Sequence, residues 1–213
     1  MKASQSMTTL GLLTALSLGV ASNTDAAIIT GVTATSQTEL TVQPRPISSM
    51  VDGTGLDAFG VHTTDASGTQ WASDFDSVDP DATPDPVTET VTFDLGGNFD
   101  LENILYWNFS GNPIFGVKDL EILTTTSVGG TQTSLGDFVF AQALPSGLSQ
   151  SVSVAGLTGS TNVREVLFVI KSEHGGTNDL AGLAEVQFEA VPEPGSLALL
   201  GLGGLLVARR RRG

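Results

Sequence analysis

The feature that most constrains the fold is a set of short stretches in which hydrophobic and polar residues alternate. In Val87–Leu95 (VTETVTFDL), the hydrophobic side chains of Val91, Phe93 and Leu95 would share one face, and threonine and aspartate side chains the other. This period of two is the pattern of a strand with one buried face. No segment between residues 28 and 190 has the helical period, so the sequence predicts an all-β domain, a β-sandwich or jelly roll.

Further strands are expected along this central region, and Gly96-Gly97-Asn98 is expected to turn the chain after the first. Val163–Lys171 is hydrophobic on both faces, as in a strand at the centre of a sheet. Thr30–Ser49 is a polar candidate edge strand. Ser73–Pro86 is predicted to be a loop, because its three prolines cannot donate to a strand ladder. Its five aspartates either bind calcium or are simply solvated. The remaining predicted strands are Leu101–Phe109, Val117–Thr124, Phe138–Ala141, Ser151–Leu157 and Leu183–Ala190.

Charge is unevenly distributed along the chain. Of 23 Asp and Glu residues, only Asp25 and Glu193 lie outside residues 28–190, whereas most of the nine Lys and Arg residues lie at the two ends. Such an acidic domain repels phosphate backbones, which argues against a nucleic-acid partner. The chain has no cysteine, so an exported form would be stabilised by its core or by a metal ion rather than by disulfides.

The N-terminal residues 1–27 have the organisation of a secretory signal peptide. Lys2 supplies a positive charge, and Leu10–Val20 is a hydrophobic stretch of the length found in such signals. Small residues suited to signal peptidase follow, at Val20-Ala21-Ser22 or Thr24-Asp25-Ala26. The alternative, a buried helix, fits the extreme N-terminal position and polar flanks less well.

The C-terminal residues 191–213 form a second distinct segment. The stretch from Pro194 to Ala208 contains 15 residues without a charge. As a helix it would reach about 22 Å, short of the ~30 Å hydrocarbon core of a bilayer. Residues 195–208 are therefore expected to form a short membrane helix. The cluster of Arg209, Arg210, Arg211 and Arg212 would stay on the cytoplasmic side, with the acidic domain outside.

The order of parts in this tail, Pro192-Glu193-Pro194, then a Gly- and Leu-rich apolar stretch, then arginines, resembles the PEP-CTERM sorting signal. The resemblance implies export by a Gram-negative bacterium, recognition and cleavage by an exosortase at the membrane, and association with extracellular polysaccharide and biofilm. Pro192, Glu193 and Pro194 would be the sorting motif, and the four arginines would retain the precursor at the membrane. The alternative is a permanent single-span anchor.

Three fragments of the central domain occur in a characteristic order. Met50-Val51-Asp52-Gly53 comes first, Val91–Gly97 (VTFDLGG) follows, and Gly182–Phe188 (GLAEVQF) comes last. This order is similar to that of the discoidin, or coagulation-factor type C, domain, a galactose-binding-like jelly roll, over about residues 48–189. The sequence departs from that pattern at Gly129–Ala143, which lacks the usual aspartate-glycine and tryptophan, and at Phe115, where a basic residue is common.

Many members of that family bind calcium beneath the V-D-G turn, and calcium takes six to eight oxygen ligands. Position by position, the resemblance implies a structural Ca²⁺ site, with Thr54 and Asp57 as departures from the usual residue types. The alternative is that Asp52 only forms a turn and Glu185 is solvated. The implied ligands are the Ser49 and Ala184 carbonyls and the Asp52, Thr54, Asp57 and Glu185 side chains.

The sequence contains no clear catalytic signature. The only histidines, His62 and His174, lie in predicted loops, and no G-x-S-x-G motif occurs. We therefore predict a non-enzymatic surface or matrix protein that binds carbohydrate or is adhesive, with Trp71 as the candidate sugar platform. Because acidic residues are plentiful, a small hydrolase of polysaccharide with paired carboxylates remains an alternative. A purely structural, permanently anchored surface protein is the other.

Overall fold

The computed structural model describes residues 26–63, 68–81, 87–143, 150–152, 160–175 and 179–192. All of them lie within one compact unit, Asp25–Glu193. Most of the predicted signal peptide, the sorting residues Glu193 and Pro194, the apolar stretch and the arginine cluster lie outside the described residues. Within the described ranges, no helix is long and apolar enough to cross a membrane.

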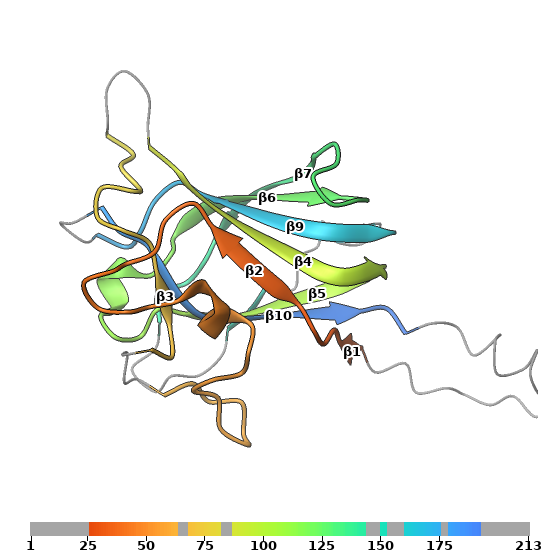
Figure 1. Ribbon diagram of the computed structural model, residues 1–213, viewed down its shortest axis with the longest axis horizontal. Helices are drawn as coiled ribbons and strands as arrows, with labels where there is room; N and C mark the ends of the chain where they lie inside the picture. Colours follow the sequence, from red (N-terminus) through yellow and green to blue (C-terminus); the bar gives the residue numbers. More distant parts are fainter. Residues whose placement is uncertain are drawn as a thin grey trace, which may run out of the picture. The chain divides into compact units, whose positions relative to one another are not determined.

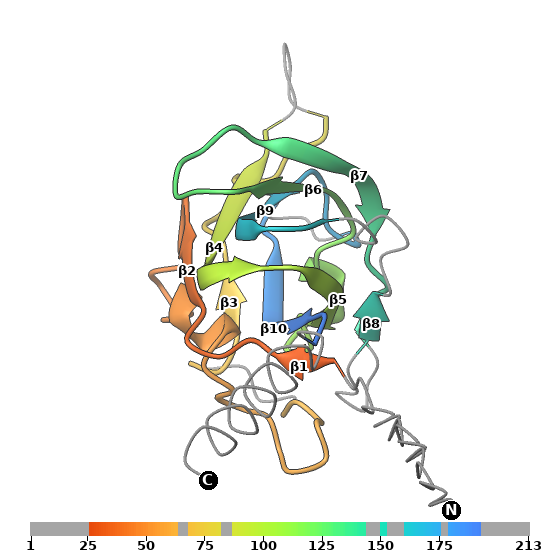
Figure 2. The ribbon, with the colours of Figure 1, turned by 90° about the vertical axis from the view of Figure 1, so that its right-hand side faces the viewer.

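The described residues form two antiparallel sheets that face each other, with two single-turn 3₁₀ helices, η1 (Ile47–Met50) and η2 (Pro113–Phe115), in the loops (Figures 1 and 2). One sheet has the order β1-β10-β5-β8, with β3 also paired to β10, and the other has the order β2-β4-β9-β6-β7. The strands are β1 (Ala27–Ile28), β2 (Thr33–Ser36), β3 (Trp71–Ala72), β4 (Glu89–Phe99), β5 (Leu101–Asn108), β6 (Asp119–Thr125), β7 (Thr133–Val139), β8 (Gln150–Val152), β9 (Val163–Ile170) and β10 (Gly182–Ala190).

Aromatic side chains from both sheets fill the space between them. Phe93 of β4 makes edge-to-face contacts with Phe168 of β9 at 5.0 Å and with Phe188 of β10 at 5.2 Å between ring centroids. Tyr106 of β5 stacks on Phe140 at 3.8 Å. These rings are buried because the alternating pattern turns one face of each strand inward. The β-sandwich predicted from the alternation is confirmed.

The strand predictions differ from the structure in two places. The strand expected over Phe138–Ala141 is β7, which runs earlier, from Thr133 to Val139, and most of the strand expected over Ser151–Leu157 lies outside the described residues. Gly96-Gly97-Asn98 does not turn the chain, because β4 continues through these residues to Phe99 and the turn comes at Asp100. The pairing of β4 with β9 is irregular between Asp94 and Phe99, and Gly96 has a φ of 76°. The glycines therefore bend a continuous strand instead of ending it. Thr30–Ser49 does contain an edge strand, β2.

The two ends of the described domain lie at the same end of the sandwich. Ala27, the last residue of the predicted signal peptide, pairs with Ala190 at the end of β10. Val191 then donates its N–H to the carbonyl of Asp100 at 2.8 Å. Figure 1 shows β1 beside the end of β10 at the right, whereas the long loops before β4 gather at the left. The start of β10 and the end of β5 therefore face away from both chain ends.

Candidate functional site

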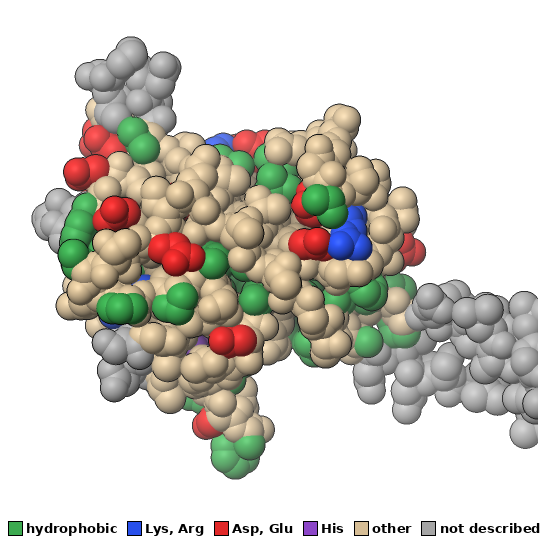
Figure 3. Space-filling model, viewed as in Figure 1, with side chains coloured by type: hydrophobic (Ala, Val, Ile, Leu, Met, Phe, Trp, Pro, Cys, Tyr) green, Lys and Arg blue, Asp and Glu red, His purple; other side chains and the backbone are tan. Residues whose placement is uncertain are grey.

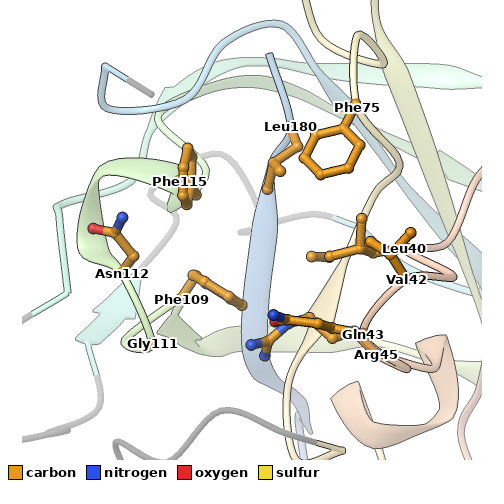
Figure 4. Close-up of a pocket in the computed structure, with 11 residues that line it drawn as sticks. Leu40, Val42, Gln43, Arg45, Phe75, Phe109, Gly111, Asn112, Phe115 and Leu180 are labelled. Atoms are coloured by element: carbon orange, nitrogen blue, oxygen red, sulfur yellow. The ribbon is translucent and has the colours of Figure 1, made fainter. Parts of the chain in front are cut away.

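A pocket of about 310 Å³ opens at the loop end of the sandwich. Its lining comes from four separate segments: the loop after β2, the end of β3 with the loop that follows, the β5–β6 loop, and the segment that leads into β10 (Figure 4). Most of the lining is apolar or aromatic, and three side chains are polar. The lining residues are Leu40, Val42, Gln43, Arg45, Ala72, Phe75, Phe109, Gly111, Asn112, Phe115 and Leu180.

The base of the pocket is a small hydrophobic cluster that packs separately from the main core. Leu40, Ala72, Phe109 and Leu180 are buried, and Phe115 packs against them while half-exposed. Phe75 is 44% exposed at the opposite side of the opening. Figure 4 shows Phe75 and Phe115 on either side of Leu180, with Phe109 below. Two accessible rings above an apolar base form the kind of concave surface on which a ligand of the size of a sugar ring can pack.

Buried amides hold the loops that line the pocket. Gln70 is fully buried, and its Oε1 accepts hydrogen bonds from the N–H groups of Ser110 at 3.0 Å and Gly111 at 3.4 Å. Asn108 is also buried and donates to the carbonyls of Val117 at 2.7 Å and Ala141 at 2.8 Å. Both ends of the β5–β6 loop are thus tied to the sandwich, so the loop residues are supported before any ligand arrives.

Arg45 is the one charged side chain among the described residues that line the pocket. It is only 7% exposed, and its guanidinium carbon lies 4.9 Å from the centre of the Phe109 ring. Such stacking is a cation–π contact, which gains strength when the cation is shielded from water. Elsewhere the domain is strongly acidic, and carboxylates are spread over the face seen in Figure 3. No Asp or Glu is among the described residues that line the pocket.

A second cluster of polar groups lies where the first long loop meets β10. Glu185 is 1% exposed, and its Oε1 accepts a hydrogen bond from the N–H of Gly53 at 3.2 Å. Its Oε2 is buried without a hydrogen-bond partner among the described residues. Burial, together with the charge of Asp52, raises the pKa of Glu185 to about 8. A buried, unsatisfied carboxylate oxygen beside a second carboxylate is a costly arrangement that a cation would relieve.

The structure brings only some of the predicted calcium ligands together. Asp52 and Glu185 are neighbours, and the register shift between Leu183 and Glu185 takes Ala184 out of the regular ladder with β5. Asp57, however, accepts hydrogen bonds from the N–H groups of Phe59 and Val61 in its own loop. No group of three or more His, Cys, Asp or Glu side chains able to hold a metal occurs among the described residues. The described residues therefore do not bring the three carboxylates Asp52, Asp57 and Glu185 into one group, and the calcium site stays a prediction.

The other two predicted ligands lie in the same loop. Ser49 is buried, and its hydroxyl donates to the carbonyl of Gly68 at 2.9 Å. Thr54 is exposed, and its N–H donates to Oδ1 of Asp52 at 2.7 Å. This second contact closes the turn that presents Asp52 and Gly53 to Glu185. One carboxylate oxygen of Asp52 thus accepts a hydrogen bond within its own turn.

Trp71 is not a sugar platform. Its side chain is fully buried in the main core, because β3 pairs with the start of β10 and turns the ring between the sheets. Tyr106 and Trp107 are also buried. The aromatic residues of the pocket, Phe75, Phe109 and Phe115, were not singled out from the sequence as ligand-binding groups. Phe75 and Phe109 lie in loops after strands and Phe115 lies in the single-turn helix η2, where alternation does not predict which side chains are exposed.

The histidines lie outside the pocket lining. His62 is buried, and its Nδ1 lies 2.9 Å from the carbonyl of Thr63. Nε2 of His174 lies 3.0 Å from the carbonyl of Phe140, and burial lowers the pKa of His174.

Of the Ser73–Pro86 aspartates, Asp74 and Asp79 cap turns in their own loop by accepting N–H bonds from Phe75 and Asp81. Asp85 lies outside the described residues.

Comparison with known proteins identifies the two parts of the chain separately. Residues 190–212 match the PEP-CTERM protein-sorting motif. No curated protein matches the chain in sequence.

Solved structures with the same fold cover most of the chain. A family 32 CBM of NanJ from Clostridium perfringens, solved in complex with galactose, has a TM-score of 0.53 and 15% identity and covers 78% of this chain and 99% of its own. Another Clostridium perfringens CBM32, in complex with GalNAc-β-1,3-galactose, has a TM-score of 0.53 and 16% identity and covers 77% and 100%. An F5/8 type C domain from Bacteroides fragilis has a TM-score of 0.54 and 10% identity and covers 81% and 99%. The chain thus carries a PEP-CTERM sorting motif behind a domain with the discoidin-like jelly-roll fold of carbohydrate-binding modules.

Proposed function

We propose that this is an exported, non-enzymatic protein that binds carbohydrate through the pocket at the loop end of its jelly roll. The observation that carries the proposal is the composition of that pocket: Phe75 and Phe115 offer accessible rings above an apolar base. Arg45, Gln43 and Asn112 supply the polar groups that would orient a ligand. Sugars are bound by this combination, because their C–H faces pack on aromatic rings while their oxygens form hydrogen bonds.

The pocket favours binding over hydrolysis. Glycoside hydrolysis ordinarily needs two carboxyl groups that flank the scissile bond. The described lining residues include neither a carboxylate nor a histidine. The neighbours in complex with galactose and with GalNAc-β-1,3-galactose share the fold at low identity and so make carbohydrate the first ligand class to test.

The sorting motif supplies the cellular context of the proposal. Signal peptidase would remove the N-terminal segment, and the C-terminal tail would hold the precursor at the inner membrane until an exosortase cleaves it. The domain would then reach the cell surface or the extracellular matrix of a Gram-negative bacterium, where polysaccharide is its partner. The geometry suits this route, because the described N- and C-terminal ends meet at one end of the sandwich while the pocket opens at the other.

A bound calcium ion is part of the same proposal, as a structural cofactor. The buried Oε2 of Glu185, the neighbouring Asp52 and the carbonyls of Ser49 and Ala184 offer the hard oxygen ligands that Ca²⁺ prefers. When bound, the ion would neutralise two carboxylates and link the first long loop to β10. Asp57 and Thr54 would act from outside this set, by shaping the loop.

A glycan array tests the binding function. The purified protein should retain a defined set of glycans, and Phe115→Ala should weaken that binding by at least tenfold. Phe59→Ala is the matched control, because it removes an equally large ring that is 90% exposed and lies outside the pocket lining. If no glycan is retained, or if the two variants behave alike, the pocket is not a carbohydrate site. Turnover of a polysaccharide by the wild-type protein would contradict the non-enzymatic assignment.

A further inference from the structure

We propose that Glu89 and Thr38 are positioning residues for glycan binding, although neither is among the described residues that line the pocket. They hold one wall of the pocket, formed by Leu40, Val42 and Phe75, in the place that a sugar ring requires. This inference rests on the proposed function and deepens it for the same pocket. It comes from a chain of hydrogen bonds that starts at a buried carboxylate and ends beside the two segments that carry this wall.

Glu89, the first residue of β4, is fully buried. Its Oε1 accepts hydrogen bonds from the N–H groups of Gln37 at 2.7 Å and Thr38 at 3.2 Å. Its Oε2 accepts one from the hydroxyl of Thr38 at 2.7 Å. Burial raises the pKa of Glu89, and the hydrogen bonds from Thr38 and Gln37 oppose that rise. A buried carboxylate is costly unless it is hydrogen-bonded, so these contacts fix the chain after β2 firmly to the start of β4.

The hydroxyl of Thr38 connects this carboxylate to a second segment. While it donates to Glu89, its oxygen accepts a hydrogen bond from the N–H of Asp74 at 3.0 Å. A threonine hydroxyl has one donor and two acceptor sites, so these two contacts use it in both roles. Because the proton is committed to the carboxylate, the oxygen is left to accept from Asp74. Thr38 therefore ties the loop after β3 to the loop after β2.

Both ends of this link lie next to the pocket wall. Leu40 lies two residues after Thr38, and Phe75 directly follows Asp74. The N–H of Leu40 also donates to the carbonyl of Ala72 at 2.9 Å, so the two segments run side by side. Figure 4 shows Leu40 and Phe75 on the same side of the pocket. The link thus sets the spacing between an apolar side chain of the base and one of the two accessible rings.

A wall that is held in place raises the affinity of a pocket without touching the glycan. When only a fraction of the molecules has the binding-competent arrangement, the observed Kd rises in inverse proportion to that fraction. Hydrogen bonds to an ionised carboxylate are stronger than neutral ones, so the loss of one shifts this population measurably. Glu89 and Thr38 should therefore set the affinity of the pocket through the position of Phe75.

A second pair with the same chemistry offers a matched control. Glu165 of β9 is 6% exposed, and its Oε2 accepts hydrogen bonds from the hydroxyl of Thr125 at 3.1 Å and from the N–H of Gly129 at 2.8 Å. This pair holds the turn between β6 and β7, and neither partner is among the described lining residues. Glu89 pairs with Ile170 at the end of β9, whereas Glu165 lies near its start.

Substitution of the two threonines in the full-length chain tests the inference. Thr38→Val removes the hydroxyl with little change of shape, and it should weaken binding of the tightest glycan of the array about fivefold. Thr125→Val removes the corresponding hydroxyl of the control pair, so it should lower Tm and leave Kd unchanged. Thr38→Ser keeps the hydroxyl and should restore the affinity. Isothermal titration calorimetry measures Kd, and differential scanning calorimetry measures Tm.

A double-mutant cycle tests whether the two residues act together. Glu89→Gln replaces one carboxylate oxygen by an N–H donor, so it should weaken binding by a factor similar to that of Thr38→Val. Combining the two substitutions should add little, because both break the same contact. Fully additive losses would show that the two residues act independently, which would overturn the proposed link.

Hydrogen exchange gives a readout that needs no glycan. In free Thr38→Val, the N–H of Asp74 has lost its acceptor, so its exchange should be about tenfold faster than in the wild type. The N–H of Gly129, which donates to Glu165, should exchange as before. Unchanged exchange at Asp74 would show that Thr38 does not hold this segment.

The outcomes separate the two proposals. If Thr38→Val binds the glycan as tightly as the wild type, the positioning role is refuted while carbohydrate binding stands. If Thr125→Val weakens binding as much as Thr38→Val, the effect is one of general stability and the inference is equally refuted. A wild-type chain that binds no glycan removes the proposed function, and the effect on affinity with it.

Discussion

The backbone N–H of Gly53 donates a hydrogen bond to Oε1 of Glu185 at 3.2 Å, across 132 residues of sequence. This contact joins the turn of the first long loop to the last strand of the sandwich. The other carboxylate oxygen of Glu185 is buried without a partner among the described residues, and the charge of Asp52 lies close by. The junction is thus destabilised as long as both carboxylates are ionised and no cation is present.

Calcium should stabilise the domain through this junction. An ion present at a hundredfold excess over its Kd adds about 2.7 kcal/mol to the free energy of unfolding. For a domain of this size we expect Tm to rise by roughly 5–10 °C in millimolar Ca²⁺ relative to chelator. Mg²⁺ should substitute poorly, because it demands a tighter octahedral shell. Differential scanning calorimetry measures both shifts.

Three substitutions assign the ligands of that ion. Asp52→Ala and Glu185→Ala should remove most of the calcium-dependent rise in Tm. Asp57→Asn should keep it, because Oδ1 of Asp57 accepts the N–H groups of Phe59 and Val61 within its own loop and an asparagine oxygen can do the same. Loss of the response in Asp57→Asn would instead place this residue in the coordination shell. An identical Tm for the wild type in calcium and in chelator would show that the junction binds no calcium.

The pH dependence of stability in chelator should report Glu185. Burial raises the pKa of this carboxyl from 4.5 to about 8 in the folded state, so folding favours its protonated form. Its contribution to stability is therefore complete below the unfolded pKa and is lost as the pH rises from about 4.5 to about 8. Without calcium, Glu185→Gln should remove this decline and melt above the wild type at pH 8. With calcium, the order should reverse. A wild-type Tm that rises steadily over this pH range in chelator would contradict the assignment.

Gly182 should be intolerant of a side chain. A Cβ at this position would lie 2.5 Å from the Phe109 ring and 2.8 Å from the carbonyl oxygen of Trp71. Since the carbonyl belongs to the paired strand β3, the Phe109 ring would have to move, and this ring lies at the base of the pocket. Gly182→Ala should cost about 1–3 kcal/mol of stability and also weaken glycan binding. Val128→Ala, at a residue 65% exposed, should change neither Tm nor affinity.

Processing of the tail should depend on Pro192, Glu193 and Pro194, and retention of the precursor at the membrane on Arg209–Arg212. We expect the released extracellular protein to lack the arginine cluster, which mass spectrometry of the intact mature chain would reveal. Replacement of Glu193 should leave the tail attached and the protein in the membrane fraction. A released form that still carries Arg212 would rule out cleavage at the tail.

Features that depend on residues close together in the sequence could be predicted, whereas features that depend on contacts between distant residues could not. The strands were predictable because a strand with one buried face has alternating hydrophobic and polar residues. Val91, Phe93 and Leu95 follow this pattern, and all three are buried. The sorting motif could be found because its parts are adjacent in sequence. Gly96 was misread because a glycine with positive φ serves equally well in a turn or in a bend within a strand.

The sequence by itself therefore determined the β-sandwich, its acidic surface and the sorting signal, since each depends on neighbouring residues or on simple composition. Only the tertiary structure decided which aromatic rings are accessible. Trp71 is buried in the core because β3 pairs with β10. Phe75 and Phe115 instead line the pocket, because the segments that carry them lie outside the two sheets. In the same way, long-range packing brought Gly53 to Glu185 and left Asp57 in its own turn. The sequence of a single segment does not predict the distance between two loops, because that distance depends on how the two sheets pack.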